Sequence, residues 1–401
     1  TDGATTTDVH TATINVFADT LGFSATGTSG STTVGGTFKS TCASTCSTTF
    51  GDVTTAVDGD GTLHYVNANV NTGSVTGSIG TSSAGLKEVI MDATAAVLNL
   101  DAGGDIYATT LTMDGAGNAN LTVSGTEATT ISSAIVATGD GDGDLFVTNT
   151  STGGVTFTGA VAGTNSLLTS NHATATKTTF KEKVNAKTIT MTGTAEIVFE
   201  KDANTVDTAL TLSTAGTGTI RLGQGIVAGE IAFTTAALTN ITAGTKIYAP
   251  ANHTSGNIIF VRDSDGAVTA GAALADFTMM DTALTDYTLN LGTVVDGASG
   301  NFTDNVNQWV ITAVAKSAAA TASELGISED SAGGLLNAND AVAGDATIRE
   351  IFSSVLQAGG ENATQLADQV QGTPSGLSAT SGAATASAGG AVTSIGSSRM
   401  A

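Results

Sequence analysis

Three acidic turns carry the residue types that bind calcium in proteins. Each turn places aspartates at alternate positions, and the glycines between them allow a sharp bend, so several carboxylate oxygens can face one point. None completes a twelve-residue calcium loop with its final glutamate, so each could equally be a solvated turn. We predict Ca²⁺ in at least one of them, with residues 140–144 as first choice. The turns are VDGDGT at 57–62 (Asp58, Asp60), GDGDGDL at 139–145 (Asp140, Asp142, Asp144) and RDSDGA at 262–267 (Asp263, Asp265).

The only two cysteines, Cys42 and Cys46, lie close together in STCASTCSTT. Without further cysteines or a nearby histidine they cannot complete a tetrahedral zinc site. A small local disulfide is the favoured interpretation, with free thiols as the alternative. A disulfide would indicate an oxidising compartment.

Lysines are concentrated in one short segment of a chain that is otherwise poor in basic residues. Four of the 13 basic residues, Lys177, Lys181, Lys183 and Lys187, fall within eleven positions. We interpret them as one solvated strand face. The alternative is a basic patch that contacts the acidic surface of a partner.

Charge and composition exclude several classes of function. Thirty-six acidic residues against 13 basic ones give a net charge of −23, which repels nucleic acids and anionic membrane surfaces. No apolar run is long enough to predict a transmembrane helix. Sugar-cleaving enzymes need clustered carboxylates and aromatic platforms for the sugar rings, and aromatic residues are only 4% of this chain. The four histidines, His10, His64, His172 and His253, are isolated in polar stretches and are expected at the surface. We therefore predict no enzyme activity and no catalytic residues.

Short strands separated by turns are expected to position these side chains. The clearest stretch is 187–233, where Gly, Asn, Asp and Thr separate five apolar or alternating runs. The runs recur every 20 to 23 residues, a period that suits the coils of a β-solenoid. They are 188–191, 196–199, 210–213, 219–222 and 230–233.

The composition also suits a narrow core. With few aromatic residues, a wide core could not be filled, whereas stacked Val, Ile, Leu, Thr and Ala fill a solenoid, and 50 glycines serve its corners. We therefore predict an all-β protein, a parallel β-solenoid (β-helix) with a short α-helical C-terminal region. An array of β-sandwiches is the alternative. The expected regions are a strand-rich N-terminal cap at 1–85, the solenoid body at 86–315, and an Ala-rich helical junction with a small-residue tail at 316–401.

The C-terminal region carries a resemblance to a known family. Strands give way to Ala-rich helical segments, then to QLADQVQGTPSGLSATSGAATA and AVTSIGSSRMA. This order resembles the junction between passenger and translocator in bacterial autotransporters (type V secretion), including rickettsial-type surface antigens. In that family a motif like Ser398, Arg399 and Met400 lies on the helix that enters the outer-membrane barrel. The resemblance implies a passenger domain without its translocator barrel, and it carries over no catalytic residues.

These observations lead to an expected function and location. The chain starts at Thr1 rather than Met, so we expect a mature secreted chain whose signal peptide has been removed. We predict a bacterial cell-surface structural protein that self-assembles into a surface layer, fibre or extracellular matrix. The alternative is an adhesin passenger that binds a host or surface ligand, and a carbohydrate-active β-helix enzyme is less favoured. Tight binding patches need Trp, Tyr or Arg anchors, which are scarce here.

Overall fold

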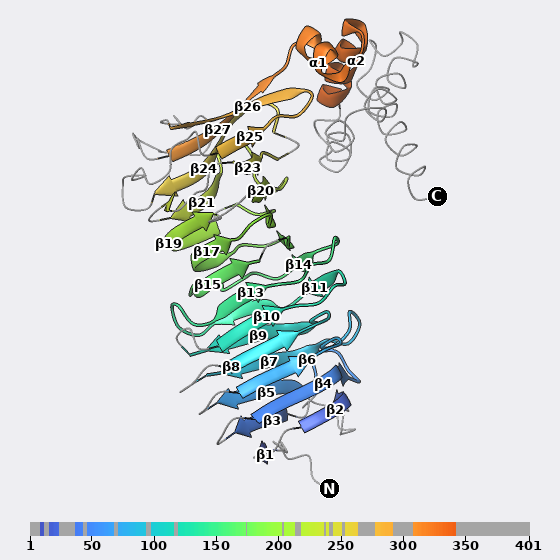
Figure 1. Ribbon diagram of the computed structural model, residues 1–401, viewed down its shortest axis with the longest axis vertical. Coiled ribbons are helices and arrows are strands. Elements are labelled where there is room, and N and C mark those ends of the chain that lie inside the picture. The colour runs from blue at the N-terminus through green and yellow to red at the C-terminus, as the bar shows by residue number, and fades with distance from the viewer. Residues whose placement is uncertain are drawn as a thin grey trace, which may run out of the picture. The chain divides into compact units, whose positions relative to one another are not determined.

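The computed structural model describes most of the chain between residues 9 and 341. The described residues form short strands and two helices (Figure 1). They fall into two compact units, Thr1–Arg221 with Ile231–Lys246 and Val261–Thr278, and Leu222–Glu230 with Ile247–Phe260 and Met279–Ala401. The described ranges are 9–11, 16–23, 37–42, 46–67, 71–93, 98–115, 119–173, 175–202, 204–212, 218–235, 238–239, 244–250, 253–263, 277–291 and 308–341.

The larger unit is a parallel β-solenoid, which confirms the predicted fold class. Successive coils contribute strands to the same sheets, and the strands of the first two sheets pair in parallel. In one coil the chain passes through β9, β10 and β11, and in the next through β12, β13 and β14. The first sheet has the order β1 (Val9–Thr11), β3 (Thr37–Cys42), β5 (Thr62–Asn67), β7 (Leu86–Asp92), β9 (Ala108–Asp114) and β12 (Ala134–Ala137).

Two further sheets complete this unit. The second contains β2 (Val16–Phe23), β4 (Cys46–Thr55), β6 (Asn71–Val75), β8 (Leu98–Ala102), β10 (Ala119–Val123), β13 (Asp144–Val147), β15 (Leu167–His172), β17 (Asn185–Met191), β19 (Asn204–Leu212) and β21 (Ile231–Thr235), and β22 (Leu238–Thr239) also pairs with β19. The third contains β11 (Thr129–Ile131), β14 (Val155–Phe157), β16 (Lys177–Phe180), β18 (Glu196–Phe199), β20 (Thr219–Leu222), β23 (Thr245–Tyr248) and β25 (Phe277–Met280).

Alternating side chains explain why these segments form strands. In β10 the residues Ala119, Leu121 and Val123 are buried, and the polar residues between them are partly exposed. Leu121 lies opposite Leu100 in β8 and Leu145 in β13, so identical side chains stack through three coils. Such a column fills a narrow interior without aromatic residues.

A short aromatic column runs through the third sheet. Phe157, Phe180 and Phe199 occupy equivalent positions in β14, β16 and β18. Their ring centroids are 5.0 Å and 5.5 Å apart in nearly parallel stacks, and all three side chains are buried. Three of the 13 phenylalanines of the chain therefore fill the interior of consecutive coils.

The length of a coil varies more than the sequence suggested. Thr188 in β17 lies opposite Ala209 in β19, 21 positions further along the chain, as the predicted period requires. Asn71 in β6 lies opposite Leu98 in β8, 27 positions further along. Within the β17–β19 pair the register itself shifts by one residue, between Ala186 and Thr188. Both sheets also continue across position 85, since β5 pairs with β7 and β6 with β8.

The smaller unit contains β24 (Gly256–Asp263) up to Phe260, together with β27 (Gln308–Ala315) and β26 (Thr285–Leu291), and the strands pair in that order. β26 and β27 pair in antiparallel fashion, unlike the coils. The helices α1 (Ala318–Leu325) and α2 (Glu329–Ala341) follow, which confirms a short helical region after the strands. The further helical segments that the sequence suggested beyond residue 341 lie outside the described residues.

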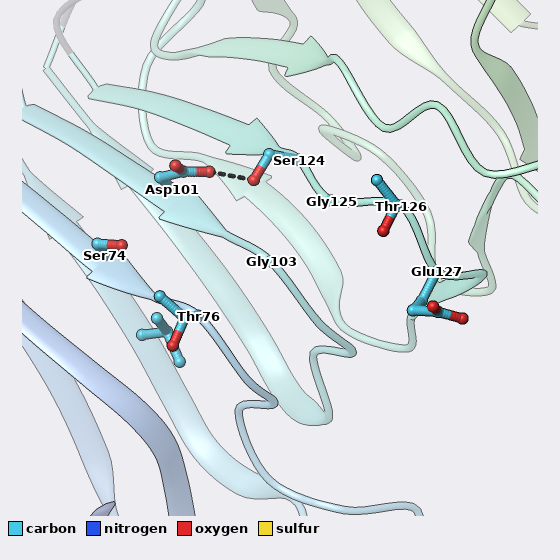
Figure 2. A pocket seen from close by; sticks show the side chains of 9 residues that line it. Ser74, Thr76, Asp101, Gly103, Ser124, Gly125, Thr126 and Glu127 are labelled. Atoms are coloured by element: carbon cyan, nitrogen blue, oxygen red, sulfur yellow. Dashed lines mark hydrogen bonds between the residues drawn. The ribbon is translucent and has the colours of Figure 1, made fainter. Parts of the chain in front are cut away.

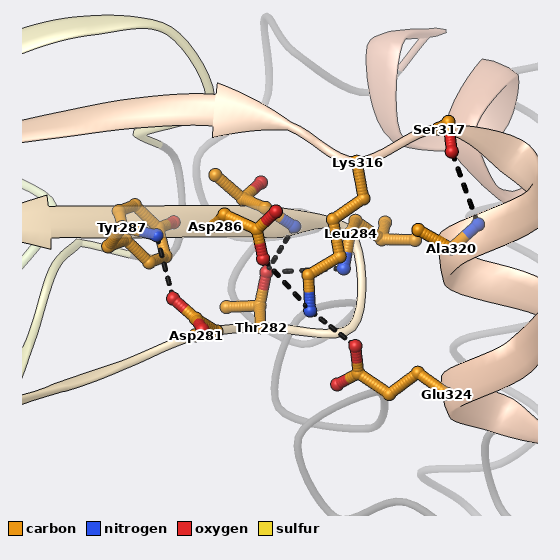
Figure 3. Close-up of polar contacts among 10 residues, drawn as sticks. Asp281, Thr282, Leu284, Asp286, Tyr287, Lys316, Ser317, Ala320 and Glu324 are labelled. Atoms are coloured by element: carbon orange, nitrogen blue, oxygen red, sulfur yellow. Dashed lines mark hydrogen bonds and ion pairs between the residues drawn. The ribbon is translucent and has the colours of Figure 1, made fainter.

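Lys316 joins α1 to the antiparallel strands (Figure 3). Its side chain is only 7% exposed, its Nζ lies 3.3 Å from Asp286 Oδ1 in β26, and it forms a second ion pair with Glu324 in α1. Burial alone would lower the pKa of Lys316, but the two carboxylates outweigh burial and raise it. Ser317 caps α1 by accepting a hydrogen bond from the Ala320 N–H at 3.2 Å, and Gly326 ends the helix in the left-handed region.

Candidate functional site

The turn between β4 and β5 contains the first pair of predicted calcium ligands. Gly59 and Gly61 both have positive φ angles, +76° and +82°, as the Asp-Gly pattern suggested. Asp58 is exposed, and its Oδ1 accepts a hydrogen bond from the Gly85 N–H at 2.9 Å. Asp60 is only 1% exposed, and neither of its carboxylate oxygens has a hydrogen-bond partner in the described structure. The turn thus holds one bonded and one unpartnered carboxylate.

The turn at 139–145 has a different arrangement, in which every carboxylate is bonded to a protein group. Asp142 Oδ2 accepts a hydrogen bond from the Gly139 N–H at 2.5 Å and lies 2.9 Å from Thr138 Oγ1, a hydroxyl that also lies 2.7 Å from Asp114 Oδ1. Asp144 accepts a hydrogen bond from Thr169 Oγ1 at 2.5 Å. Burial raises the pKa of Asp144, although the bond to Thr169 opposes that shift.

Asp140 is held by the next coils. Its Oδ1 accepts hydrogen bonds from the side chain and the backbone N–H of Ser166, and its Oδ2 lies 3.1 Å from Lys187 Nζ. The Ser166 hydroxyl, followed by Lys187, holds the pKa of Asp140 below its usual range. Asp140, Asp142 and Asp144 therefore each bind a different set of protein donors.

The third calcium turn and the cysteine pair lie partly outside the described residues. Asp263 ends β24, but its side chain and all of Asp265 lie outside the described residues. Cys42 ends β3 and Cys46 begins β4, and their side chains also lie outside the description. The disulfide and the third calcium turn remain predictions.

The lysine group is divided by the fold. Lys187 lies in β17 and contacts both the carboxylate and the backbone oxygen of Asp140, each at 3.1 Å. Lys177, Lys181 and Lys183 are exposed, at the start of β16 and in the turn that follows it. Lys177 lies opposite Glu196 of the next coil, and Glu196 binds Arg221 Nε at 3.1 Å. The three exposed lysines remain a predicted partner contact.

Carboxylates elsewhere in the solenoid bond repeatedly to the next coil. In each case an Asp or Glu oxygen accepts a hydrogen bond from a Ser or Thr hydroxyl or a backbone N–H that lies 23 to 27 positions further along the chain. We call these the cross-coil carboxylate bonds. The pairs are Asp52–Ser78, Asp58–Gly85, Glu88–Thr112, Asp101–Ser124, Asp105–Thr130, Asp114–Thr138, Asp140–Ser166 and Asp144–Thr169.

One polar groove lies beside the cross-coil bond between Asp101 and Ser124 (Figure 2). Its volume is about 300 Å³, and Ser74, Thr76 and Glu127 also line it. Hydroxyls and carboxylates can bind polar groups, but none of the described residues that line the groove is an aromatic residue that could stack on a sugar ring. The groove is thus a poor match to a carbohydrate-cleaving site.

Two histidines lie in the core, so the expectation that the histidines are surface residues was wrong for them. His172 is 1% exposed, and its Nε2 and Nδ1 each lie 3.0 Å from a hydroxyl, of Ser170 and Thr178 respectively. Burial lowers the pKa of His172 to about 3. His253 is buried against Tyr287, and burial lowers its pKa to about 4.

The sequence did contain a signal for the buried position of His172. It occupies the strand position equivalent to Val147 and Met191, both of which point inward. The inward hydroxyls of Ser170 and Thr178 satisfy the ring nitrogens, which makes burial of a neutral imidazole tolerable. His64 is partly buried, with Nε2 3.9 Å from Asp92, and the side chain of His10 lies outside the described residues.

Within the described ranges, no three His, Cys, Asp or Glu side chains gather in a way that could hold a metal ion. The described helices are likewise too short and too polar to cross a membrane. Comparisons of the chain with protein-family models, with curated proteins and with solved structures gave no match.

Proposed function

We propose that this protein is a secreted bacterial cell-surface structural protein that self-assembles into a surface layer, fibre or extracellular matrix. The carrying observation is the series of cross-coil carboxylate bonds. Catalytic carboxylates face a substrate and converge on it, whereas eight acidic side chains here bond one coil to the next. Acidic residues used in this way stabilise a scaffold.

The bonds suit a chain that must stay folded outside a cell. Each is a charge-assisted hydrogen bond, which is about twice as strong as a neutral one. Because a solenoid coil contacts only its neighbours, stability depends on every coil-to-coil interface. The C-terminal resemblance to autotransporter passengers supports a surface location for such a scaffold.

Self-assembly can be tested directly on the purified full chain. We expect ordered sheets or filaments in negative-stain electron microscopy, and particle size by light scattering should rise with protein concentration. A net charge of −23 makes copies repel one another, so assembly should be favoured as salt screens that repulsion. Dispersed single particles at every salt and protein concentration would contradict the proposal and leave the adhesin as the better candidate.

A further inference from the structure

We propose that the turn between β4 and β5 binds one Ca²⁺ ion through the carboxylate of Asp60, with Asp58 of the same turn as a second ligand. The inference does not depend on self-assembly, because binding can be measured on the dispersed chain. It begins with the buried carboxylate of Asp60, whose two oxygens both lack a partner in the described structure.

Asp60 occupies a position that is apolar in the following coils. Thr62 lies opposite Glu88, and continuing that register two residues back places Asp60 opposite Leu86. Leu86 lies opposite Ala108, and both are buried. The interior column thus runs from a carboxylate to two aliphatic side chains.

The surroundings of the turn make an uncompensated charge costly. A Cβ atom added to Gly61 would lie 2.6 Å from Phe23 Cγ, so the backbone beside Asp60 packs directly on an aromatic ring. Burying an ionised carboxylate without a donor or a counter-charge is strongly unfavourable. Something must compensate the charge of Asp60 in the folded protein.

A bound cation is one such partner, because no protein donor engages either carboxylate oxygen in the described structure. A cation compensates the charge, and both carboxylate oxygens can coordinate it. Calcium suits this turn because it takes bidentate carboxylates and irregular geometry, whereas Mg²⁺ demands a near-ideal octahedron and retains its water.

Asp58 offers an additional ligand from the solvent side. Only its Oδ1 is used by the Gly85 N–H. Asp58 is exposed, so an ion bound to it can also take water as a ligand. The turn at 139–145 has the same spacing, but its carboxylates need no cation as a partner, because the Gly139 N–H already donates to Asp142.

The test is calcium binding by isothermal titration on the full chain, with Asp60→Asn as the main variant and Asp142→Asn as the matched control. We expect Asp60→Asn to weaken binding by at least about tenfold, since loss of even an outer-shell partner has that effect. Asp142→Asn should bind like the wild type. Magnesium should bind more weakly than calcium in the wild type.

A second variant separates loss of binding from loss of folding in Asp60→Asn. Asp60→Leu places in the turn the side chain of the equivalent residue Leu86, so we expect it to fold without metal and to bind no calcium. Added Ca²⁺ should raise the Tm of the wild type but not that of Asp60→Leu. The proposal is overturned if the wild type binds no calcium, if both Asp60 variants bind as tightly as the wild type, or if Asp142→Asn abolishes binding.

Discussion

Acid should weaken the coil that contains His172 more than the rest of the solenoid. The ring is buried and neutral, and its pKa is about 3 in the folded protein against an ordinary value of 6.5. As the pH falls below 6.5, the unfolded chain takes up a proton at His172 and the folded chain does not. The free energy of unfolding therefore falls progressively from pH 6.5 downward, until the ring in the folded protein is protonated too, near pH 3.

The size of the effect follows from the pKa difference. Each pH unit between the two pKa values costs about 1.4 kcal/mol for one proton. Between pH 6.5 and pH 4.5 the loss from His172 alone should therefore be about 3 kcal/mol. Carboxylates also titrate in this window, including Asp144 in the adjacent strand β13, so the measurement must isolate the histidine.

Hydrogen exchange in β15, β16 and β17, corrected for the intrinsic pH dependence of exchange, is the suitable assay. His172→Gln keeps polar atoms near Ser170 and Thr178 but does not titrate, so the wild type should lose about 3 kcal/mol more protection than the variant on acidification. His64→Gln, in the distant strand β5, should leave this difference unchanged. If wild type and His172→Gln lose equal protection, the ring does not stay neutral in the core and the reasoning is refuted.

Three further variants test a ring stack, a close backbone contact and a pair of salt bridges. Phe180→Ala removes both ring stacks and should cost about 3 to 5 kcal/mol, seen as faster exchange in β14, β16 and β18; a uniform change along the chain would contradict it. Gly61→Ala should lower the Tm more than Gly59→Ala, by the equivalent of at least about 1 kcal/mol, because only the former meets Phe23; equal effects would argue against the close approach. Lys316→Met should cost about 1 kcal/mol, since both partner carboxylates are roughly half-exposed, and limited proteolysis of α1 should report it; unchanged cleavage would exclude a docking role.

Much of the fold could be predicted from local pattern. The runs at 188–191, 196–199 and 219–222 lie within or coincide with β17, β18 and β20, because alternation and turn residues are local signals. The start of β19 was placed six residues too late, since it begins at Asn204 and not at 210. Asn204 is buried, and its Oδ1 accepts a hydrogen bond from the Val184 N–H in the preceding coil. A polar residue satisfied by another coil has no local signature.

The candidate calcium turns were likewise predictable only in their local features. The Asp-Gly spacing correctly indicated sharp turns, since Gly59, Gly61, Gly141 and Gly143 all have positive φ angles. The spacing could not show which aspartates find protein donors. That depends on groups about 25 positions away, such as Ser166 for Asp140, and on whether the neighbouring column is apolar, as it is for Asp60.

The aromatic column has a consequence for how such a gene can change in length. Phe157, Phe180 and Phe199 occupy equivalent positions, so removal of residues 158–180 would bring Phe157 opposite Phe199 and restore the same ring contact. The strand β13 would then face β17 in place of β15, with Val147 opposite Met191. Duplication of the segment would extend the column by one ring. Deletions and duplications of whole coils should therefore be tolerated here, whereas a change of a few residues would break the register.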